Sequence, residues 1–197
     1  MNIIERVKNI LIIPKTEWEV VDGETATPQS LLMSYVLPLA VLSAIGPLLT
    51  GFLYPGLMGL NYFLVLAVVA FIGTVLTYYV SIYIIDALAG SFASEKDINK
   101  TAQLVAYSRT PGYIASLLGF IPVLGAILGI AAWVYSIYIM YLGLGPLKKT
   151  PEDKKVVYLI VSFVLIFIVS IVIGAILGMV LFSAMGVSTV STGRFGF

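Results

Sequence analysis

A single run of 36 residues without a charged side chain, residues 112–147, most constrains what this chain can fold into. One membrane-crossing helix needs about 20 apolar residues, so a run of this length must fold back on itself. Gly119, Pro122 and Gly125 lie in its middle. Proline ends or kinks a helix because it has no N–H to donate and its ring clashes with the preceding turn. The sequence therefore predicts a helical hairpin with its turn near residues 120–123.

The overall composition excludes several classes of protein. Hydrophobic residues make up 60% of the chain and charged residues only 11%, which is typical of a helical protein that crosses a membrane several times. A net charge of +1 offers no basic surface for a nucleic acid. The chain has no cysteine and no histidine, so it lacks the usual metal ligands, thiol nucleophile and general base. We therefore expect no metal, no cofactor and no enzymatic activity.

The rest of the chain divides into apolar spans separated by polar loops. A second uncharged run, residues 25–85, holds two spans, with the glycine- and proline-containing segment 51–62 as the turn between them. A highly charged loop, residues 147–155, precedes the last apolar stretch. The prediction is an all-α, polytopic membrane protein with a five-transmembrane-helix bundle in residues 27–186. Its spans cover about residues 30–52, 62–89, 104–120, 123–144 and 156–182, and residues 187–197 form an extracytoplasmic tail.

Residues 1–26 precede the first span and are predicted to form a cytoplasmic interfacial segment. Residues 2–13 fit an amphipathic helix with one apolar face, made of Ile3, Ile4, Val7, Ile10 and Leu11. Such a helix is too short to span a bilayer, so we expect it to lie among the lipid headgroups with this face toward the hydrocarbon. Trp18, in a second short helical segment, is a candidate interface anchor. The alternative is that the helix packs on the protein's own loops.

The positions of the basic residues predict an orientation. In a five-span arrangement, the N-terminus, the loop 91–103 with Arg109, and the loop 147–155 fall on one side of the membrane. That side holds Arg6, Lys8, Lys15, Lys96, Lys100, Arg109, Lys148, Lys149, Lys154 and Lys155, and the other side holds only Arg194. Cytoplasmic loops carry an excess of lysine and arginine, so we expect a cytoplasmic N-terminus and an extracytoplasmic C-terminus.

Asp86 and Arg109 are the only charged residues expected near the membrane interior. Ionisable residues at that depth are costly and are usually paired or functional. We therefore expect an intramembrane ion pair between these two side chains, joining the second and third spans. The alternative is that each is solvated separately at the cytoplasmic interface, since arginine can extend its charged end to the headgroups.

Tyrosines cluster on two of the predicted spans. Tyr78, Tyr79 and Tyr83 lie on the second span, and Tyr135, Tyr138 and Tyr141 recur on the fourth, near Trp133. These side chains could line a cavity for a lipid or a small apolar ligand. The alternative is helix packing together with an aromatic belt near the cytoplasmic interface.

The pentapeptide GAILG occurs twice, on the fourth and fifth predicted spans. Its glycines are Gly125 and Gly129 in the first copy and Gly174 and Gly178 in the second. Small residues four positions apart let helix backbones approach closely in lipid. The two copies favour packing of the fourth span on the fifth, with homodimerisation through one of them as the alternative.

The opening residues NIIERVKNILIIPKTEWEVV look like the N-terminus of bacterial members of the Yip (Ypt-interacting protein) family. The order of later pieces resembles that family as well: DALAGSF, then LVAYSRTP, the GFIPVLG turn and YSIYIMYLGL. The residues in these motifs are Tyr107, Ser108, Thr110 and Pro111, then Pro122 and Gly125, then Tyr135, Ser136 and Tyr138. The resemblance implies a five-span protein of prokaryotic type, with its N-terminus in the cytoplasm, in a cytoplasmic membrane. It also implies eukaryotic relatives that act in vesicle traffic between the ER and the Golgi and contact Rab-type GTPases.

Together these features predict a non-enzymatic membrane-organising or partner-binding protein. Its expected contacts are membrane lipids, a cytoplasmic protein partner and a second copy of the chain. The N-terminal amphipathic helix and the loop 147–155 are the segments expected to touch lipid headgroups or a soluble protein. The alternative is a small oligomeric transporter or channel with Asp86 and Arg109 near its route.

Overall fold

The chain folds into helices joined by short turns, and a computed structural model describes residues 2–184. The N-terminal part comprises α1 (Ile3–Ile12) and α2 (Pro14–Asp22). A continuous rod follows, made of α3 (Pro28–Leu31), the π-helical turn η1 (Leu32–Val36) and α4 (Leu37–Leu53). The remaining elements are α5 (Pro55–Met58), α6 (Leu60–Ala89), the 3₁₀ turn η2 (Gly90–Phe92), α7 (Ile98–Ser108), α8 (Thr110–Leu117), the 3₁₀ turn η3 (Leu118–Phe120), α9 (Leu124–Lys148) and α10 (Glu152–Ala184). The predicted tail, residues 187–197, lies outside the described residues.

Local sequence explains where several of these helices begin. Asn2, Thr27 and Asp97 each accept a hydrogen bond from a backbone N–H in the first turn of the helix that follows. Proline occupies the first or second position of α2, α3 and α8. There its missing N–H costs no hydrogen bond, because the first N–H groups of a helix have no partner within it.

Within residues 2–184, four helical segments are long and apolar enough to cross a membrane: Pro28–Leu53, Leu60–Phe92, Leu124–Lys148 and Glu152–Ala184. The predicted third span, residues 104–120, is not a continuous helix. It is divided into α7, α8 and η3, with a break at Arg109. Pro111 explains the break, because it cannot donate to the carbonyl of Tyr107. That carbonyl accepts the hydroxyl of Thr110 instead (2.7 Å).

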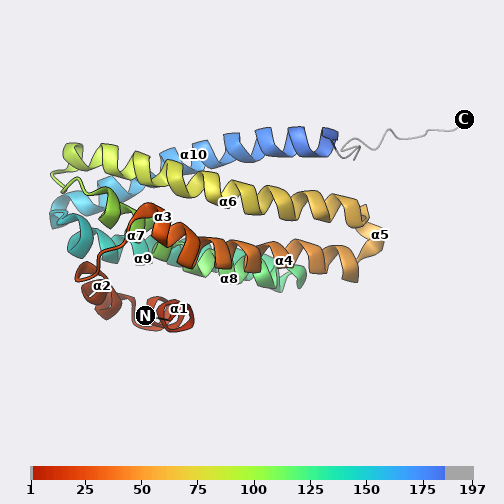
Figure 1. Cartoon of the computed structure of the whole chain (residues 1–197), viewed down its shortest axis with the longest axis horizontal. Coiled ribbons are helices and arrows are strands. Elements are labelled where there is room, and N and C mark those ends of the chain that lie inside the picture. The colour runs from red at the N-terminus through yellow and green to blue at the C-terminus, as the bar shows by residue number, and fades with distance from the viewer. Residues whose placement is uncertain (1, 185–197) are drawn as a thin grey trace, which may run out of the picture.

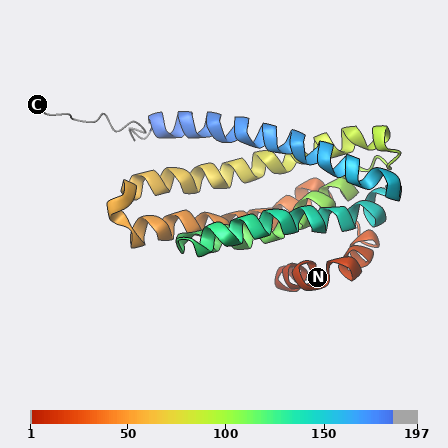
Figure 2. The same cartoon turned by 180° about the vertical axis from the view of Figure 1, so that it is seen from behind.

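The long helices form two layers (Figures 1 and 2). In one layer α10 packs along α6, and in the other α4, α8 and α9 lie together. The outer face of α10 stays uncovered and exposes apolar side chains such as Ile168, Val172 and Met179. The buried core is densest at the end of the bundle where α2 and α7 meet the C-terminal half of α9, and it includes Trp18, Leu104 and Leu144.

The turn between α8 and α9, here called the elbow (residues 118–123), lies short of the turn between α4 and α6 (Figures 1 and 2). Val123 has φ of 63° and ψ of −58°, and the N–H of the next residue donates to the carbonyl of Pro122 (2.6 Å). This is a γ-turn with positive φ, a strained conformation for a β-branched residue. Gly125 allows close packing here, because a Cβ at this position would lie 2.9 Å from the Cα of Gly119.

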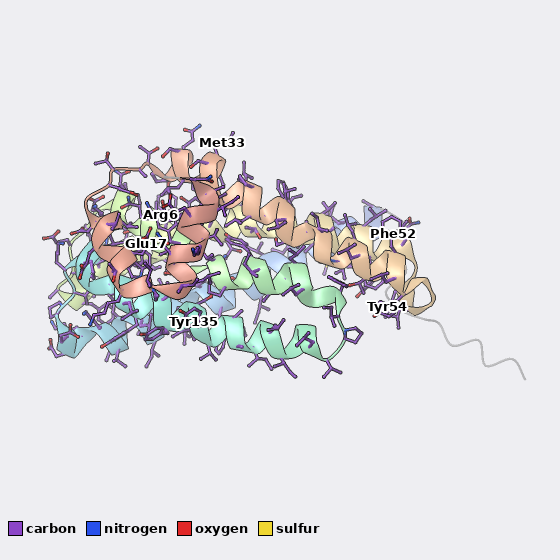
Figure 3. The ribbon with its side chains drawn as sticks, turned by 90° about the horizontal axis from the view of Figure 1, so that it is seen from below. Arg6, Glu17, Met33, Phe52, Tyr54 and Tyr135 are labelled. Carbon is purple, nitrogen blue, oxygen red and sulfur yellow. The ribbon has the colours of Figure 1, made fainter. Side chains whose placement is uncertain are left out.

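Helix α1 crosses the long helices instead of running along them. It is seen end-on in Figure 1 and from the side in Figure 3. Tyr135 of α9 fixes its level along the bundle, because the Tyr135 hydroxyl donates to the carbonyl of Leu11 (2.8 Å). On the face predicted to meet lipid, Ile3 and Val7 pack against the core, whereas Ile4 points outward with 73% of its surface exposed.

Two other residues predicted to face lipid, Ile10 and Trp18, are fully buried in the protein core. The indole of Trp18 packs against Gly143, where a Cβ would lie 2.8 Å from the ring, and its Nε1 donates to the carbonyl of Ile139 (2.9 Å). The prediction of an interface anchor at Trp18 was therefore wrong. The glycine in α9 opens the space that the indole fills, and helical spacing alone does not reveal such a tertiary contact.

The two GAILG motifs do not bring α9 and α10 into close contact. A Cβ placed at Gly129 or Gly174 would meet nothing within 4 Å, and one at Gly178 would meet only a side chain of its own helix. The predicted packing through these glycines was therefore wrong. Two helices do approach closely at Gly46 in α4, where a Cβ would collide with the backbone of Ser116 in α8.

Candidate functional site

Arg6 of α1 is buried among residues of α2, the loop that follows it and α7, with only 4% of its surface exposed (Figure 3). Its guanidinium pairs with Glu17 (2.5 Å) and with Glu24, and Asn9 donates to the other carboxylate oxygen of Glu17 (3.0 Å). The centre of the guanidinium lies 5.0 Å from the ring centre of Tyr107, within the range of a cation–π interaction. This cluster attaches the N-terminal helices to the bundle.

The YSRTP motif at the α7–α8 break completes the cluster. The ring of Tyr107 meets that of Tyr35 edge-on, with 4.8 Å between ring centres. The Tyr35 hydroxyl donates to Oγ1 of Thr110 (2.7 Å), whose own hydrogen goes to the carbonyl of Tyr107. The tyrosine and the threonine of the motif therefore face the N-terminal helices, and with Arg6 they join segments that are distant in the sequence.

Asp86 and Arg109 do not form the expected ion pair. Asp86 accepts hydrogen bonds from Nζ of Lys148 (2.9 Å) and Oγ1 of Thr101 (3.0 Å). Arg109 lies about 12 Å further along the polypeptide than Thr101, at 1.5 Å per helical residue. The prediction was wrong because it left out Lys148, which α9 carries to the level of Asp86 and which is fully buried there.

Other lysines of the charged loop also bind carboxylates of the protein itself. Lys149 pairs with Asp22 of α2 (2.7 Å), and Lys155 pairs with Glu152 (2.5 Å). The hydrogen bond from Lys149 holds the pKa of the Asp22 carboxyl below its ordinary value, and the nearby charge of Lys100 acts in the same direction. The contacts of Asp22 with Lys100 and Lys149 fasten α2 to the ends of α7 and α9.

A cavity of about 850 Å³ lies between the two layers of helices. Its volume is within the range of small-molecule sites, about 300–1,000 Å³. Most of the lining is apolar or lacks a side chain, for example Phe63, Leu66, Gly129, Phe163, Ile166 and Gly174. Polar residues also line it: Ser108, Arg109 and Tyr113 come from the α7–α8 break, opposite the side of the motif that faces Arg6.

The motif residues divide between the cavity, the elbow and the N-terminal helices. Ser108, Gly125 and Ser136 line the cavity, whereas Tyr107 and Thr110 belong to the Arg6 cluster and Pro111 is buried at the break. Pro122 forms the elbow, Tyr135 binds α1, and Tyr138 stacks on Tyr135 with 5.9 Å between ring centres. None of the six tyrosines singled out on the second and fourth spans is among the residues that line this cavity.

Sequence reasoning missed Glu17, Glu24 and Lys148 as partners of buried charges. One signal was available for the first cluster: Arg6 falls on the same helical face as Ile3 and Ile10, at spacings of three and four residues. A charge on an apolar face indicates a partner on the neighbouring element. Within residues 2–184, no group of three histidine, cysteine, aspartate or glutamate side chains is placed to hold a metal ion.

Comparison with known proteins identifies the family. A search of curated proteins found no match, and a search of solved structures found none. Among protein families, the Yip1 domain matches residues 8–174. This range begins within α1, ends within α10, and contains the α7–α8 break, the elbow and the residues that line the cavity. Because the match covers most of the chain, the protein belongs to the Yip1 family of membrane proteins.

Proposed function

We propose that this protein is a non-enzymatic membrane protein that organises the bilayer around it by placing α1 and the α8–α9 hairpin in the cytoplasmic leaflet. The Yip1 family generally consists of membrane proteins that are not enzymes, which supports the first part of the proposal. The observation that carries the second part is the level of α1 relative to the elbow.

Helix α1 marks the surface of the membrane on its side of the bundle. It exposes Glu5 and Lys8 as well as the apolar side chains of Ile4 and Ile12. A helix with this mixture, lying across the long helices, is suited to the headgroup region and not to the hydrocarbon. The N-terminus is then cytoplasmic, as the distribution of basic residues predicts, and the membrane is a cytoplasmic membrane of prokaryotic type.

The elbow then ends near the middle of the bilayer. From Tyr135, which binds α1, the helix α9 runs only about 17 Å to its first residue, at 1.5 Å per residue. The hydrocarbon core is about 30 Å deep. Irregular backbone at that depth must satisfy its own hydrogen bonds. The N–H groups of Ile121, Leu124 and Gly125 all bond to carbonyls within the elbow region (3.2, 2.6 and 2.7 Å).

A re-entrant hairpin of this kind and an interfacial helix both add volume to one leaflet only. In this arrangement α4, α6 and α10 are the complete crossings, so the N-terminus and C-terminus still lie on opposite sides. The excess of protein in the cytoplasmic leaflet favours membranes in which that leaflet is the more expanded one. The proposed activity is therefore mechanical and needs no reacting group.

The absence of cysteine makes the topology directly testable. Val123→Cys places a thiol at the elbow, and Leu57→Cys places one in α5, at the turn between α4 and α6. We expect a membrane-impermeant maleimide added outside cells to label the Leu57→Cys variant and to label Val123→Cys only after detergent is added. Labelling of both from outside would show a complete fifth crossing and would reject the hairpin.

The membrane-organising activity needs a second measurement. Purified protein reconstituted with vesicles of mixed diameter should be enriched in the small ones, with the N-terminus on their outer face. Replacing both Ile4 and Ile12 with glutamine should reduce that enrichment, because α1 then loses its exposed apolar contacts. Val20→Gln, on the exposed side of α2, is the matched control. Equal distribution of the wild-type protein over all diameters would contradict the proposal.

A transporter or channel is the second candidate, and the cavity beside Arg109 is the observation that favours it. Asp86 supports it less, because its carboxylate is bound to Lys148 and Thr101. Flux across a liposome membrane that is lost in Arg109→Gln would support transport. A protein that changes vesicle sorting without any flux would support the membrane-organising function.

A further inference from the structure

Arg109 lines the cavity between the helix layers without a partner for its charge. Within residues 2–184 its side chain takes part in no ion pair and no hydrogen bond. Every other buried or half-buried cation described above, such as Arg6 and Lys148, is bound to a carboxylate. An arginine beside an apolar cavity is costly unless an anion compensates it.

Two neighbours of Arg109 lack partners as well. Oγ of Ser108 and the hydroxyl of Tyr113 have no hydrogen-bond partner, although their residues are only 3% and 5% exposed. Buried polar groups in proteins nearly always form a hydrogen bond, so two hydroxyls without a partner, in residues that line one cavity, require an explanation. Gly112 lies between them in the cavity lining, and a Cβ at this position would meet nothing within 4 Å.

We propose that Arg109 binds the anionic headgroup of an amphiphile, a phosphate or a carboxylate on a hydrocarbon chain, and that the chain occupies the cavity. Arginine pairs with both of these anions through two parallel hydrogen bonds. The hydroxyls of Ser108 and Tyr113 are the nearest donors along the chain that have no partner. The headgroup contact is independent of the membrane-organising function, because it uses neither α1 nor the elbow.

The rest of the cavity suits a hydrocarbon chain. From the level of Arg109 the lining follows α8 to Gly119, about 15 Å at 1.5 Å per residue. Most facing residues on the other layer are apolar, among them Phe63, Phe163 and Ile173. The polar residues of that layer in the lining carry hydroxyls and no charge: Thr74, Thr77, Ser81 and Ser170. Arg109 lies two residues after Tyr107, which contacts Arg6 of α1, so it lies near the proposed headgroup level. The bound amphiphile would therefore have the same orientation as the lipids of the cytoplasmic leaflet.

The experiment measures binding of single-chain lipids to the full-length protein in a neutral detergent by native mass spectrometry. The probes are oleoyl lysophosphatidate, oleate, oleoyl lysophosphatidylcholine and inorganic phosphate. We expect lysophosphatidate or oleate, or both, to bind at least ten times more tightly than lysophosphatidylcholine, which has the same chain but no net charge. The tighter of the two anions identifies the headgroup. Equal binding of lysophosphatidylcholine, or equal binding of inorganic phosphate, would overturn the proposal.

Variants separate the headgroup contact from the chain contact. Arg109→Gln should lower the affinity for the anionic lipid at least tenfold. Arg109→Lys should lower it less than Arg109→Gln does, because lysine keeps the charge but cannot make the two parallel hydrogen bonds. Lys8→Gln on α1 is the control. Gly129→Leu should exclude the chain, because its position opens on the cavity and leucine suits the helix. This variant tests the site even where Arg109→Gln fails to fold. Unchanged affinity in Gly129→Leu, or in a folded Arg109→Gln, would overturn the proposal.

Discussion

Lys148, the last residue of α9, donates a hydrogen bond of 2.9 Å to the carboxylate of Asp86 near the end of α6. The lysine is fully buried, and its Nζ also donates to the hydroxyl of Thr101 in α7 (2.6 Å). One ammonium group therefore joins α9 to α6 and α7. This contact determines where the ends of α6, α7 and α9 meet.

Removing the carboxylate should destabilise the protein strongly. Asp86→Leu leaves the Lys148 ammonium buried and unpaired, for which a loss of about 3–5 kcal/mol in the free energy of unfolding is expected. The double variant Asp86→Leu, Lys148→Met should regain most of that loss, because no charge is then left buried. Chemical unfolding in detergent measures both. Lys149→Met, at a half-exposed position, is the control, and an equal loss in it would contradict this account.

A similar result is expected at the N-terminal cluster. Arg6→Met removes the cation that neutralises Glu17, which is as deeply buried as the arginine. The expected cost is about 3–5 kcal/mol for leaving a buried charge alone. Because the cluster holds α1 and α2 on the bundle, limited proteolysis should also release the N-terminal segment faster. Lys8→Met, on the exposed side of α1, should change neither quantity. Full protection of the segment in Arg6→Met would argue against the cluster as its attachment.

The GAILG spacing predicts close helix packing at Gly129, whereas the structure places a close helix contact at Gly46. One variant at each position compares the two expectations. Gly46→Ala should destabilise the protein because the new methyl group collides with the backbone of Ser116, and backbone cannot move aside as a flexible side chain does. Overpacking of this kind costs about 1–3 kcal/mol. Gly129→Ala should be neutral or stabilising, since its Cβ meets open space and alanine favours the helix. Thermal unfolding in detergent measures the stability of both variants. A larger loss of stability in Gly129→Ala than in Gly46→Ala would contradict the close contact between α4 and α8.

The two tryptophans should differ in their contact with lipid. Trp133 on α9 is 54% exposed, whereas Trp18 is enclosed by the core. In liposomes of brominated phospholipid, fluorescence of the Trp18→Phe variant should therefore be strongly quenched. Fluorescence of Trp133→Phe, which reports Trp18 alone, should be almost unaffected. Strong quenching of Trp18 would restore the original expectation that it anchors the protein at the interface.

The helices could be predicted from the sequence because long apolar runs and proline or glycine turns act locally. Thus α6 covers residues 60–89 where 62–89 was expected, and the turn between α8 and α9 falls at Pro122. The partners of buried groups could not be predicted. Whether Trp18 meets lipid or Gly143, and whether Asp86 meets Arg109 or Lys148, depends on how helices pack at a distance. The break at Pro111 could be predicted only in part. A proline indicates that the helix is interrupted, but which motif residues face Arg6 and which face the cavity depends on how the helices pack.

The uncovered face of α10 has a consequence for how the whole molecule sits in a lipid slab. Residues 156–184 of this helix are apolar over about 43 Å, at 1.5 Å per residue, whereas the flank beneath α1 is apolar over less than half that length. A hydrocarbon layer about 30 Å thick matches neither flank. A rigid bundle reduces such hydrophobic mismatch by tilting, and its neighbouring lipids stretch on one side and compress on the other. With α1 at the headgroups as proposed, we therefore expect the protein to lean in its membrane, at an angle that changes with bilayer thickness.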